Sequence, residues 1–543
     1  MAEHRAVGAP LSDGARPNPA IERSPTGVTA FVGRTLKGPV DQPVRVSSFA
    51  DFQQTFGGLW QPSTLSYAIE QYFENGGRHA IVSRVVNGAR PPTLTLPAER
   101  GELTLVGVNP GSREYLRASV DYDGVGEAER DRFNLIVQRI RLPGTEQIED
   151  QEIFRRISVE PDSPRFIGNL LLESRLVRLH GGAFPVRPDK TTGAPSGPAI
   201  RYVSSRGDGD DGAPLTDYDL IGSAVKSTGL HALQAGEGFD LLCIPPLSRE
   251  RDLGLATLLV AARFCRDRHA LLLLDPPAEW TTPQTALAAF RGWPFRSANA
   301  AMFFPRLTVL DRVRKRPETF GSAAAAAGML ARADERLPVW APAEGEEPML
   351  RPAFKLATVV GDAERERLAQ AGINTLQSMR ATGRACLTPC TLAGDASGLA
   401  DLRLLPARRL GLFVVRSIER STRWLLAAPN EPQSWQRAHD QVEQFLEELD
   451  REGAFAGSEP KDSYFVVCDE RVNRRETVAE GKLHLLFGIA TIRPAEFHSW
   501  LITYQDHASR VRTVAVNRLA TSQQRVDWEI ETAMAGPSRR RPG

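Results

Sequence analysis

Two continuous apolar runs, each closed by a pair of prolines, constrain the fold of this chain most strongly. They are "LLCIPP", which begins at Leu241, and "ALLLLDPP", which begins at Ala270. Runs without polar alternation are typical of strands that are buried on both faces of a sheet. A helical stretch over 253–267 separates the two runs. Strand, helix and strand in this order predict a parallel α/β sheet with both faces covered.

The rest of the chain shows different patterns on either side of this region. Residues 29–95 alternate strand and helix signals, and residues 96–215 hold short alternating runs broken by polar loops, which predicts a mostly β insertion. Residues 216–345 carry the two apolar runs, and residues 346–505 return to mixed elements. Residues 1–28 have little apolar periodicity and are expected to be an N-terminal arm, and residues 506–543 are expected to be a C-terminal arm.

Composition gives no sign of a nucleic-acid or membrane partner, because the net charge of the 543 residues is only +1. Five cysteines form no even disulfide framework, so we expect a reducing compartment. Cys386 and Cys390 have no neighbouring His or Cys to complete a zinc site, and we predict no bound metal.

No secretory signal is predicted, since residues 1–25 lack an apolar stretch. The longest apolar runs are interrupted by Arg263 and Asp275 and fall short of the ~20 residues that a membrane helix needs. We therefore expect a soluble protein that is made in the cytoplasm.

A near-match to a phosphate-binding loop lies after an apolar run, at Gly33 and Gly38. Such a loop requires Lys and Ser or Thr directly after the second glycine, but Pro39 and Val40 stand there. Proline also removes a backbone N–H that would bind phosphate. We therefore predict a turn between two strands, with no nucleotide and no other cofactor.

A hydrolytic site in the α/β region is the rival hypothesis. Asp275 ends a strand, with His269 nearby and Ser223 and Ser248 upstream. The sequence has no G-x-S-x-G nucleophile motif and no H-E-x-x-H metal motif. Each of these side chains has an ordinary role in a turn or a helix end, so we predict no catalytic residues and no enzymatic activity.

Two amphipathic helices are predicted with buried stripes. In the first, Phe49, Phe52 and Phe56 recur on one face after a possible cap at Ser48. The second covers 432–452, with Asn430 as cap and Gly453 beyond its end. Its apolar stripe consists of Trp435, Ala438, Val442, Phe445, Leu446 and Leu449.

The opposite face of the second helix is acidic. It carries Asp440, Glu443, Glu447, Glu448 and Asp450. A solvated surface helix is one interpretation of this pattern. The other is a helix that faces a basic partner in an assembly.

A candidate strand for pairing with another subunit follows at 509–519. Its central residues are Arg510, Val511, Arg512, Thr513, Val514, Ala515 and Val516. One side mixes arginine with valine, as in an edge or inserted strand. The preceding loop, "QDHAS", would carry the strand away from its own domain. The alternative is that the strand folds back on its own core.

In order along the chain, several motifs resemble the tail sheath proteins of contractile phages and contractile injection systems. They extend from about residue 20 to 505 and include "TAFVGRTLKGPVDQPVRVSSFADFQQTFGGL", "NGGRHAIVSRVV", "ISVEPDSPRFIGNLLLESRLVRL", "LGLFVVRSIERSTRWLLAAPNEPQSW" and "GIATIRPAEF". The chain lacks the extended "PGVYVEE"-like beginning of the family and continues for about forty residues after "PAEF". These departures leave room for a specialised paralogue.

This resemblance implies an α/β and α+β multidomain fold. N- and C-terminal segments (29–95 and 346–505) would form a mixed-sheet core, with an inserted subtilisin-like α/β domain (216–345), a mostly β outer insertion (96–215) and extended arms (1–28 and 506–543). The subunits would stack as hexameric rings around an inner tube and exchange strands through their arms. The partners implied are further copies of the chain, the inner tube protein, and baseplate and tail terminator proteins, with assembly in the bacterial cytoplasm.

Overall fold

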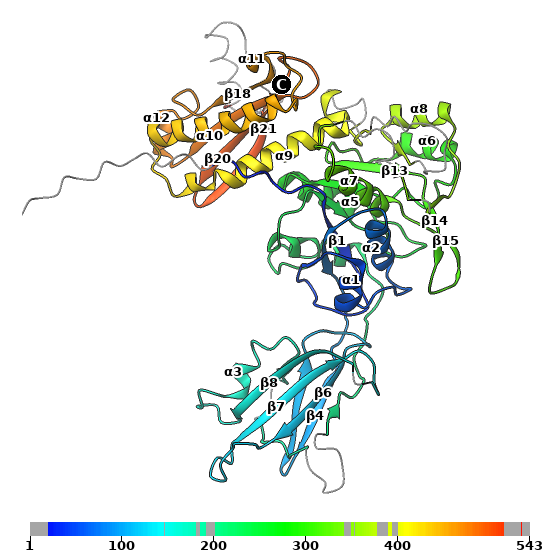
Figure 1. Cartoon of the computed structure of the whole chain (residues 1–543), viewed down its shortest axis with the longest axis vertical. Helices are drawn as coiled ribbons and strands as arrows, with labels where there is room; N and C mark the ends of the chain where they lie inside the picture. Colours follow the sequence, from blue (N-terminus) through cyan, green and yellow to red (C-terminus); the bar gives the residue numbers. More distant parts are fainter. Residues whose placement is uncertain are drawn as a thin grey trace, which may run out of the picture. The chain divides into compact units, whose positions relative to one another are not determined.

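The computed structural model describes residues 20–145, 147–180, 185–191, 201–341, 349–351, 353–376, 389–393, 400–514 and 534 (Figure 1). The chain divides into two compact units. One consists of Pro25–Arg408, and the other combines Met1–Ser24 with Arg409–Gly543. The second unit is therefore built from both ends of the chain.

A seven-stranded sheet is the centre of the larger unit. Its strands are parallel to their neighbours, except that β2 runs antiparallel to β3. In spatial order they are β17 (Asn374–Thr375), β13 (Ala300–Phe304), β12 (Leu271–Leu274), β11 (Leu241–Cys243), β1 (Val28–Gly33), β3 (His79–Arg84) and β2 (Val44–Val46). The two apolar runs that predicted a parallel sheet are the adjacent strands β11 and β12.

Helices cover both faces of this sheet, because successive side chains of each buried strand point to opposite sides. On one face, Ala30, Leu242 and Leu272 share a core with residues of α5 (Leu255–Asp267), α6 (Pro283–Gly292) and α8 (Asp362–Ala371). On the other face, Phe31 packs edge-to-face on Tyr72 of α2 (Thr64–Glu74), with ring centroids 5.4 Å apart. Helix α7 (Ala323–Asp334) packs on α2 and on β11, β12 and β13.

The prediction that N- and C-terminal segments build one mixed-sheet core is wrong. Strands β1, β2 and β3 from the first segment join the strands of 216–345 in one sheet. Among the described residues of 346–505, only the two-residue strand β17 belongs to that sheet. The reason lies in β1, "VTAFVG", in which every residue is buried. A strand that is apolar on both sides requires a covered position inside a parallel sheet, which β11 and β3 provide.

The smaller elements of this part complete the larger unit. Helix α1 (Phe49–Phe56) begins after Ser48, whose Oγ accepts a hydrogen bond from the Asp51 N–H, as the sequence predicts. Phe52 and Phe56 are buried, but Phe49 is only half-buried. The remaining elements are α4 (Asp217–Ile221), the 3₁₀ helices η1 (Gly229–Gln234) and η3 (Ala400–Arg403), and a small sheet of β15 (Arg316–Phe320), β14 (Leu307–Asp311) and β16 (Lys355–Leu356).

Two antiparallel sheets form the region between β3 and α4, drawn mostly in cyan in Figure 1. One is β4 (Thr93–Ala98), β5 (Gly101–Gly107) and β9 (Val177–Leu179); the other is β10 (Val203–Ser204), β6 (Tyr115–Asp121), β7 (Arg132–Ile140) and β8 (Ile148–Ser158). Inward side chains of both sheets, such as Leu94, Leu105, Leu116 and Phe133, share one core with the short helix α3 (Ile167–Leu170). Alternation along β4 and β5 gives each strand one buried and one more exposed side.

The second unit contains a four-stranded antiparallel sheet. Its order is β18 (Tyr464–Val467), β19 (Leu483–Ala490), β20 (Phe497–Gln505) and β21 (Ala508–Val514). Its helices are α9 (Leu405–Ser421), which begins in the first unit, α10 (Pro432–Arg451), α11 (Pro460–Ser463), α12 (Arg475–Ala479) and η4 (Arg423–Leu426).

One face of this sheet packs on α9. Gly411 permits close approach, since a Cβ at this position would lie 3.1 Å from the Trp500 ring. The Thr422 hydroxyl and the Tyr504 hydroxyl are 2.5 Å apart, and the Ser509 hydroxyl donates to Glu419 at 2.8 Å. These contacts hold β20 and β21 against the helix.

Candidate assembly surfaces

The buried stripe of α10 fixes which side of the helix is exposed. All six predicted stripe residues are buried, and Phe445 packs on Phe413 of α9. The predicted cap is wrong, because Glu431 occupies the cap position without a side-chain hydrogen bond. Asn430 instead accepts a hydrogen bond from the Trp435 indole at 2.8 Å and donates to the Lys482 carbonyl at 2.9 Å. This arrangement ties the start of α10 to the start of β19.

The acidic side chains of α10 divide into two groups. Glu443, Glu447 and Asp450 lie close enough to Tyr464 to help burial raise the pKa of its hydroxyl. Glu447 also forms an ion pair with Arg451 one turn later. Glu448 lies on another side of the helix, near the Arg23 guanidinium. We call Asp440, Glu443, Glu447 and Asp450 the acidic strip of α10. Glu448 does not belong to it, because this residue lies near the N-terminal segment.

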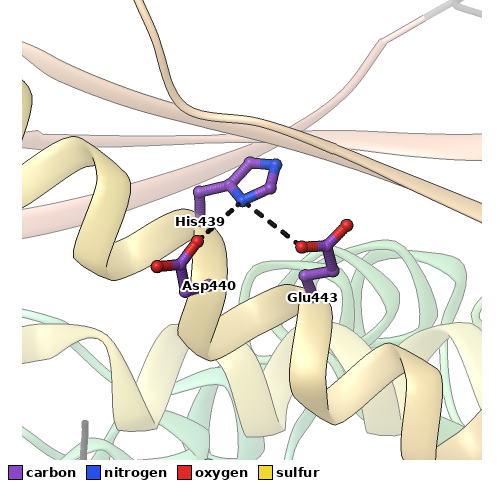
Figure 2. A group of neighbouring side chains, drawn as sticks. All are labelled: His439, Asp440 and Glu443. Atoms are coloured by element: carbon purple, nitrogen blue, oxygen red, sulfur yellow. Dashed lines mark hydrogen bonds and ion pairs between the residues drawn. The ribbon is translucent and has the colours of Figure 1, made fainter.

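His439 lies among the acidic residues at the start of the strip, a feature that the sequence analysis missed. Figure 2 shows its ring between the carboxylates of Asp440 and Glu443. The Nδ1 atom is 3.3 Å from Asp440 Oδ1 and 3.7 Å from Glu443 Oε2. These three side chains are of metal-ligating types, but all belong to one exposed part of a single helix, and we infer no metal site from them.

The second candidate surface is the edge of the four-stranded sheet formed by β21. Arg510, Val511, Arg512, Thr513 and Val514 lie in this strand, whereas Ala515 and Val516 lie outside the described residues. β21 pairs with β20 of its own chain over its whole length. The segment that was predicted to carry the strand away is a tight turn, with positive φ at both Asp506 and His507. Within one chain, the strand thus takes the fold-back position that the sequence analysis left open.

A third feature, which sequence reasoning missed, is the short N-terminal segment of the second unit. The backbone N–H groups of Glu22 and Ser24 donate to the hydroxyls of Ser421 and Ser417 on α9, at 3.0 and 2.9 Å. Arg23 donates to both carboxylate oxygens of Glu452, at 3.0 and 2.5 Å. This bidentate pair holds the pKa of Glu452 below its usual value. Among residues 20–24, Ile21 is the one buried apolar residue. A single apolar residue forms no periodic pattern, so the sequence does not predict that this segment packs on α9.

The glycine turn after β1 packs against α1 and is fixed by a buried guanidinium. Gly38 has a φ of +104°, and a Cβ there would lie 2.7 Å from the Phe56 ring. The buried Arg84 guanidinium donates to the Gly38 carbonyl at 2.6 Å. Lys37 is 2.5 Å from Glu149, which belongs to β8. The turn therefore joins the large sheet to the antiparallel sheets through charged contacts.

Three of the four residues considered for hydrolysis accept hydrogen bonds from backbone N–H groups. Asp275 accepts a hydrogen bond from the Ala323 N–H at the start of α7, at 2.7 Å, and burial raises its pKa. The Ser223 and Ser248 hydroxyls accept hydrogen bonds from nearby backbone N–H groups, those of Lys226 and Glu250.

Four of the five cysteines are buried free thiols, namely Cys243, Cys265, Cys390 and Cys468, while Cys386 lies outside the described residues. In the described part of the chain, no helix has the length and apolar character of a membrane span.

Three solved structures share this fold across most of the chain. The PVC sheath complex of an extracellular contractile injection system, in its contracted state, is 15% identical, with 97% of this chain and 100% of that chain covered at a TM-score of 0.53. The contracted helical sheath of the anti-feeding prophage (AFP) is 17% identical, with 91% and 98% covered at 0.53. The sheath tail protein Lin1278 of Listeria innocua is 12% identical, with 90% and 96% covered at 0.58. No protein-family model and no curated protein matches the chain.

Proposed function

We propose that this chain is a structural subunit of a contractile sheath, which assembles as stacked hexameric rings around an inner tube and contracts to drive that tube through a target envelope. The observation that carries the proposal is the shared fold, which covers 97% of this chain and the whole of a contractile sheath subunit. A match to one domain would carry no such weight, because single folds serve many functions. We propose no enzymatic reaction.

The acidic strip of α10 is the proposed contact for the tube or for an adjacent subunit. Asp440, Glu443 and Glu447 are about half exposed, so their carboxylates are available to a basic surface. Exposed charges contribute orientation and association rate more than affinity. We therefore assign this strip to the positioning of the sheath on its partner.

Strand exchange through the C-terminal arm is the proposed link between subunits. β21 is the last strand of its sheet, so in the described chain its outer backbone groups face no further strand. Main-chain pairing at such an edge provides affinity, and the alternating side chains provide register. Repetition of a heterologous contact of this kind generates an open helical assembly. The further partners proposed are baseplate and terminator proteins, with assembly inside the bacterial cell.

Electron microscopy of the purified protein tests the proposal. The chain should form striated tubes of uniform width in negative stain, either alone or when produced together with the tube protein of its own particle. A protein that stays monomeric under both conditions and reacts with an active-site probe would overturn the sheath assignment in favour of a hydrolase.

A further inference from the structure

Two cavities lie at the carboxyl ends of the parallel strands in the larger unit. The first is lined by α2, by the start of α7 and by the loops that follow β11, β12 and β13. The second lies toward α5, which covers the other face of the sheet. Pro246 and Asp275, which follow β11 and β12, line both cavities. The two spaces therefore adjoin at these strand ends.

Parallel sheets commonly bind ligands at a position of this kind. β3, the next parallel strand after β1 in the chain, lies on one side of β1, whereas β11, β12 and β13 follow one another on the other side. The order of the strands thus reverses between β1 and β11. At such a reversal the helices leave a crevice beyond the carboxyl ends of the strands, and small molecules bind in that crevice.

The first cavity contains a hydrogen-bond acceptor that lacks a donor. Gln71 of α2 lines this cavity and is only 3% exposed. Among the described residues, its side-chain Oε1 atom has no hydrogen-bond partner. A buried acceptor of this kind destabilises a folded protein unless another molecule supplies the donor. Gln71 therefore indicates a guest that donates a hydrogen bond.

Asp275 places a carboxyl group between the two cavities. Its Oδ1 atom accepts a hydrogen bond from the Ala323 N–H at 2.7 Å, but in the described part of the chain it forms no ion pair. A Cβ at Gly321 would lie 2.3 Å from both carboxylate oxygens, so the carboxyl group lies directly against the turn before α7. Burial raises the pKa of Asp275, and the Ala323 hydrogen bond and the charge of Arg306 offset only part of this effect. A cation bound beside Asp275 would stabilise its ionised form.

The two arginines of the first cavity are already paired with other carboxylates. Arg249 forms ion pairs with Glu318 and, at 2.7 Å, with Asp311. Arg306 forms an ion pair with Asp252. Because these carboxylates compensate both guanidinium groups, an anionic guest would find no uncompensated positive charge at the arginines. The unpaired carboxyl group of Asp275 and the free acceptor of Gln71 instead favour a cationic donor.

The second cavity is apolar and larger than the first. Its apolar lining includes Ile244, Leu253, Leu255, Leu258, Leu274 and Trp293. The first cavity has a volume of about 30 Å³ and the second of about 90 Å³. A water molecule needs roughly 10–15 Å³ of such volume, and a cavity of about 150 Å³ binds benzene. The first cavity thus suits a group of the size of an ammonium ion, and the second suits a few aliphatic carbons.

We propose that the two cavities form one binding site for a short aliphatic primary amine, with its ammonium group on Gln71 Oε1 and Asp275 and its hydrocarbon chain in the apolar cavity. A primary ammonium group carries positive charge and three donors, which match the unpaired carboxyl group and the free acceptor. Binding involves no reaction. The site goes beyond the proposed sheath function and lies within the larger unit, so it does not depend on assembly.

Calorimetric titration of the full-length protein with n-butylammonium chloride tests the site. One molecule should bind per chain, with a Kd of about 0.1–10 mM for so small a ligand. n-Butanol, which has the same chain without the charge, should bind at least about tenfold more weakly. n-Propylammonium should bind about fourfold more weakly because it lacks one buried methylene. Equal binding of butylammonium and butanol, or no binding of butylammonium, would overturn the proposal.

Two substitutions locate the ammonium group. Gln71→Leu removes the acceptor at nearly constant volume, so it should weaken butylammonium binding about tenfold while the unliganded protein stays at least as stable in chemical denaturation. Asp275→Asn keeps an acceptor for the Ala323 N–H and should also weaken binding by about tenfold or more. Gln54→Leu, at an exposed position of α1, is the matched control and should bind like the wild type. Unchanged affinity in Gln71→Leu contradicts the site, even if Asp275→Asn does not fold.

A further titration distinguishes a free amine from a lysine of another protein chain. Nα-acetyl-lysine N-methylamide presents the same four-carbon ammonium group on a peptide backbone. It should bind more weakly than n-butylammonium, because its backbone does not fit beside the chain in the apolar cavity. Tighter binding of the lysine derivative would show that the site takes a side chain of a partner, and the assignment to a free amine would be wrong. None of these results depends on polymerisation, so a failed sheath assignment and a failed amine site are distinguishable.

Discussion

The seven-stranded sheet ends in β2 and β17, which are three and two residues long, whereas the four-stranded sheet ends in β18 and β21, which have four and seven. Very short edge strands offer little backbone for another chain to pair with, and a long edge strand is a template for pairing. The side chains differ as well. Arg510 and Arg512 share one side of β21 with Val514, so this edge carries charge beside apolar surface.

This difference suggests to us that the seven-stranded sheet contributes mainly stability, whereas the four-stranded sheet carries surfaces for contact with other chains. The seven-stranded sheet buries both faces under helices and contributes stability to its own unit. The four-stranded sheet has the longer edge, the acidic strip of α10 nearby and the segment Ile21–Ser24 on its helices. We therefore propose that the contacts between copies of the chain lie in the second unit, and the following experiments test that proposal.

Removal of the C-terminal arm gives the largest expected effect. A chain truncated after Tyr504 loses β21 and should not polymerise, while the unit Pro25–Arg408 should unfold at the same temperature as in the full chain. Calorimetry and negative-stain microscopy measure the two outcomes. A chain truncated after Ala520 keeps β21 and should still form tubes. If the chain truncated after Tyr504 still formed contractile tubes, the placement of the contacts between copies of the chain on β21 and the C-terminal arm would be wrong.

Charge reversal on α10 should abolish assembly on tubes without unfolding the protein. The variant combines Glu443→Lys, Glu447→Lys and Glu448→Lys, all at partly or fully exposed positions. Surface changes of this kind alter stability by only about 0.5 kcal/mol each. The control reverses three exposed glutamates of the same unit, Glu470, Glu476 and Glu480. Normal particles from the α10 variant would show that the strip is only solvated.

Removal of a buried aromatic side chain from the larger unit should lower the stability of that unit and leave the surfaces of the second unit unchanged. Phe52 is fully buried and stacks between Phe49 and Phe56, with ring centroids 5.8 and 5.4 Å away. Phe52→Ala should lower the free energy of unfolding by about 3–5 kcal/mol, because it leaves a cavity. Gln54→Ala, at an exposed position of the same helix, should cost less than about 0.5 kcal/mol in chemical denaturation. Equal effects of the two variants would contradict the packing.

The two units should respond to pH in opposite directions, with the smallest effect of the four. Burial lowers the pKa of His484 on β19 to about 4, from 6.5. The unfolded chain then binds a proton that the folded unit excludes, so this unit loses stability as pH falls from about 6.5 to about 4. Burial raises the pKa of Glu70 on α2 to about 7, from 4.5, so the larger unit loses stability as pH rises through that range.

Hydrogen exchange resolves this pH response by region. Between pH 7 and 5, amides of β19 should become less protected and those of α2 more protected. His484→Gln and Glu70→Gln should each flatten the response of its own unit and leave the other unchanged. A parallel response of both units, or one that survives both substitutions, would argue against the assignment to these two groups.

The sequence predicts strongly periodic elements well. The parallel strands, both amphipathic helices and the stripe from Trp435 to Leu449 lie where the patterns place them, since each pattern reflects burial of one surface. Strand partners across long separations are harder to predict. β1 pairs with β11, although Thr29 and its partner Leu241 lie far apart in the sequence. The mostly apolar sequence of β1 was the available signal that it belongs in a parallel sheet.

Local chemistry accounts for the other errors. Asn430 is a good cap residue, but the Trp435 indole and the Lys482 carbonyl occupy its side chain. "QDHAS" reads as a loop, yet Asp506 and His507 both accept the left-handed conformation that a tight turn requires. In the candidate sites, the acidic residues of α10 were found by helical spacing. His439 and Arg23 were not, because their roles depend on neighbours that spacing does not reveal.

The pairing of Ile21–Ser24 with α9 and α10 has a consequence for the order of events during synthesis. Glu22 and Ser421 are 399 residues apart, and Arg23 and Glu452 are 429 apart. At about 5–20 residues per second, the ribosome needs roughly 20–80 s after making the first partner to make the second. The unit Pro25–Arg408 is translated in full during that interval, while the second unit lacks its helices. A nascent chain therefore holds the complete first unit before the partners of Ile21–Ser24 exist, and this N-terminal segment stays without those contacts throughout the interval.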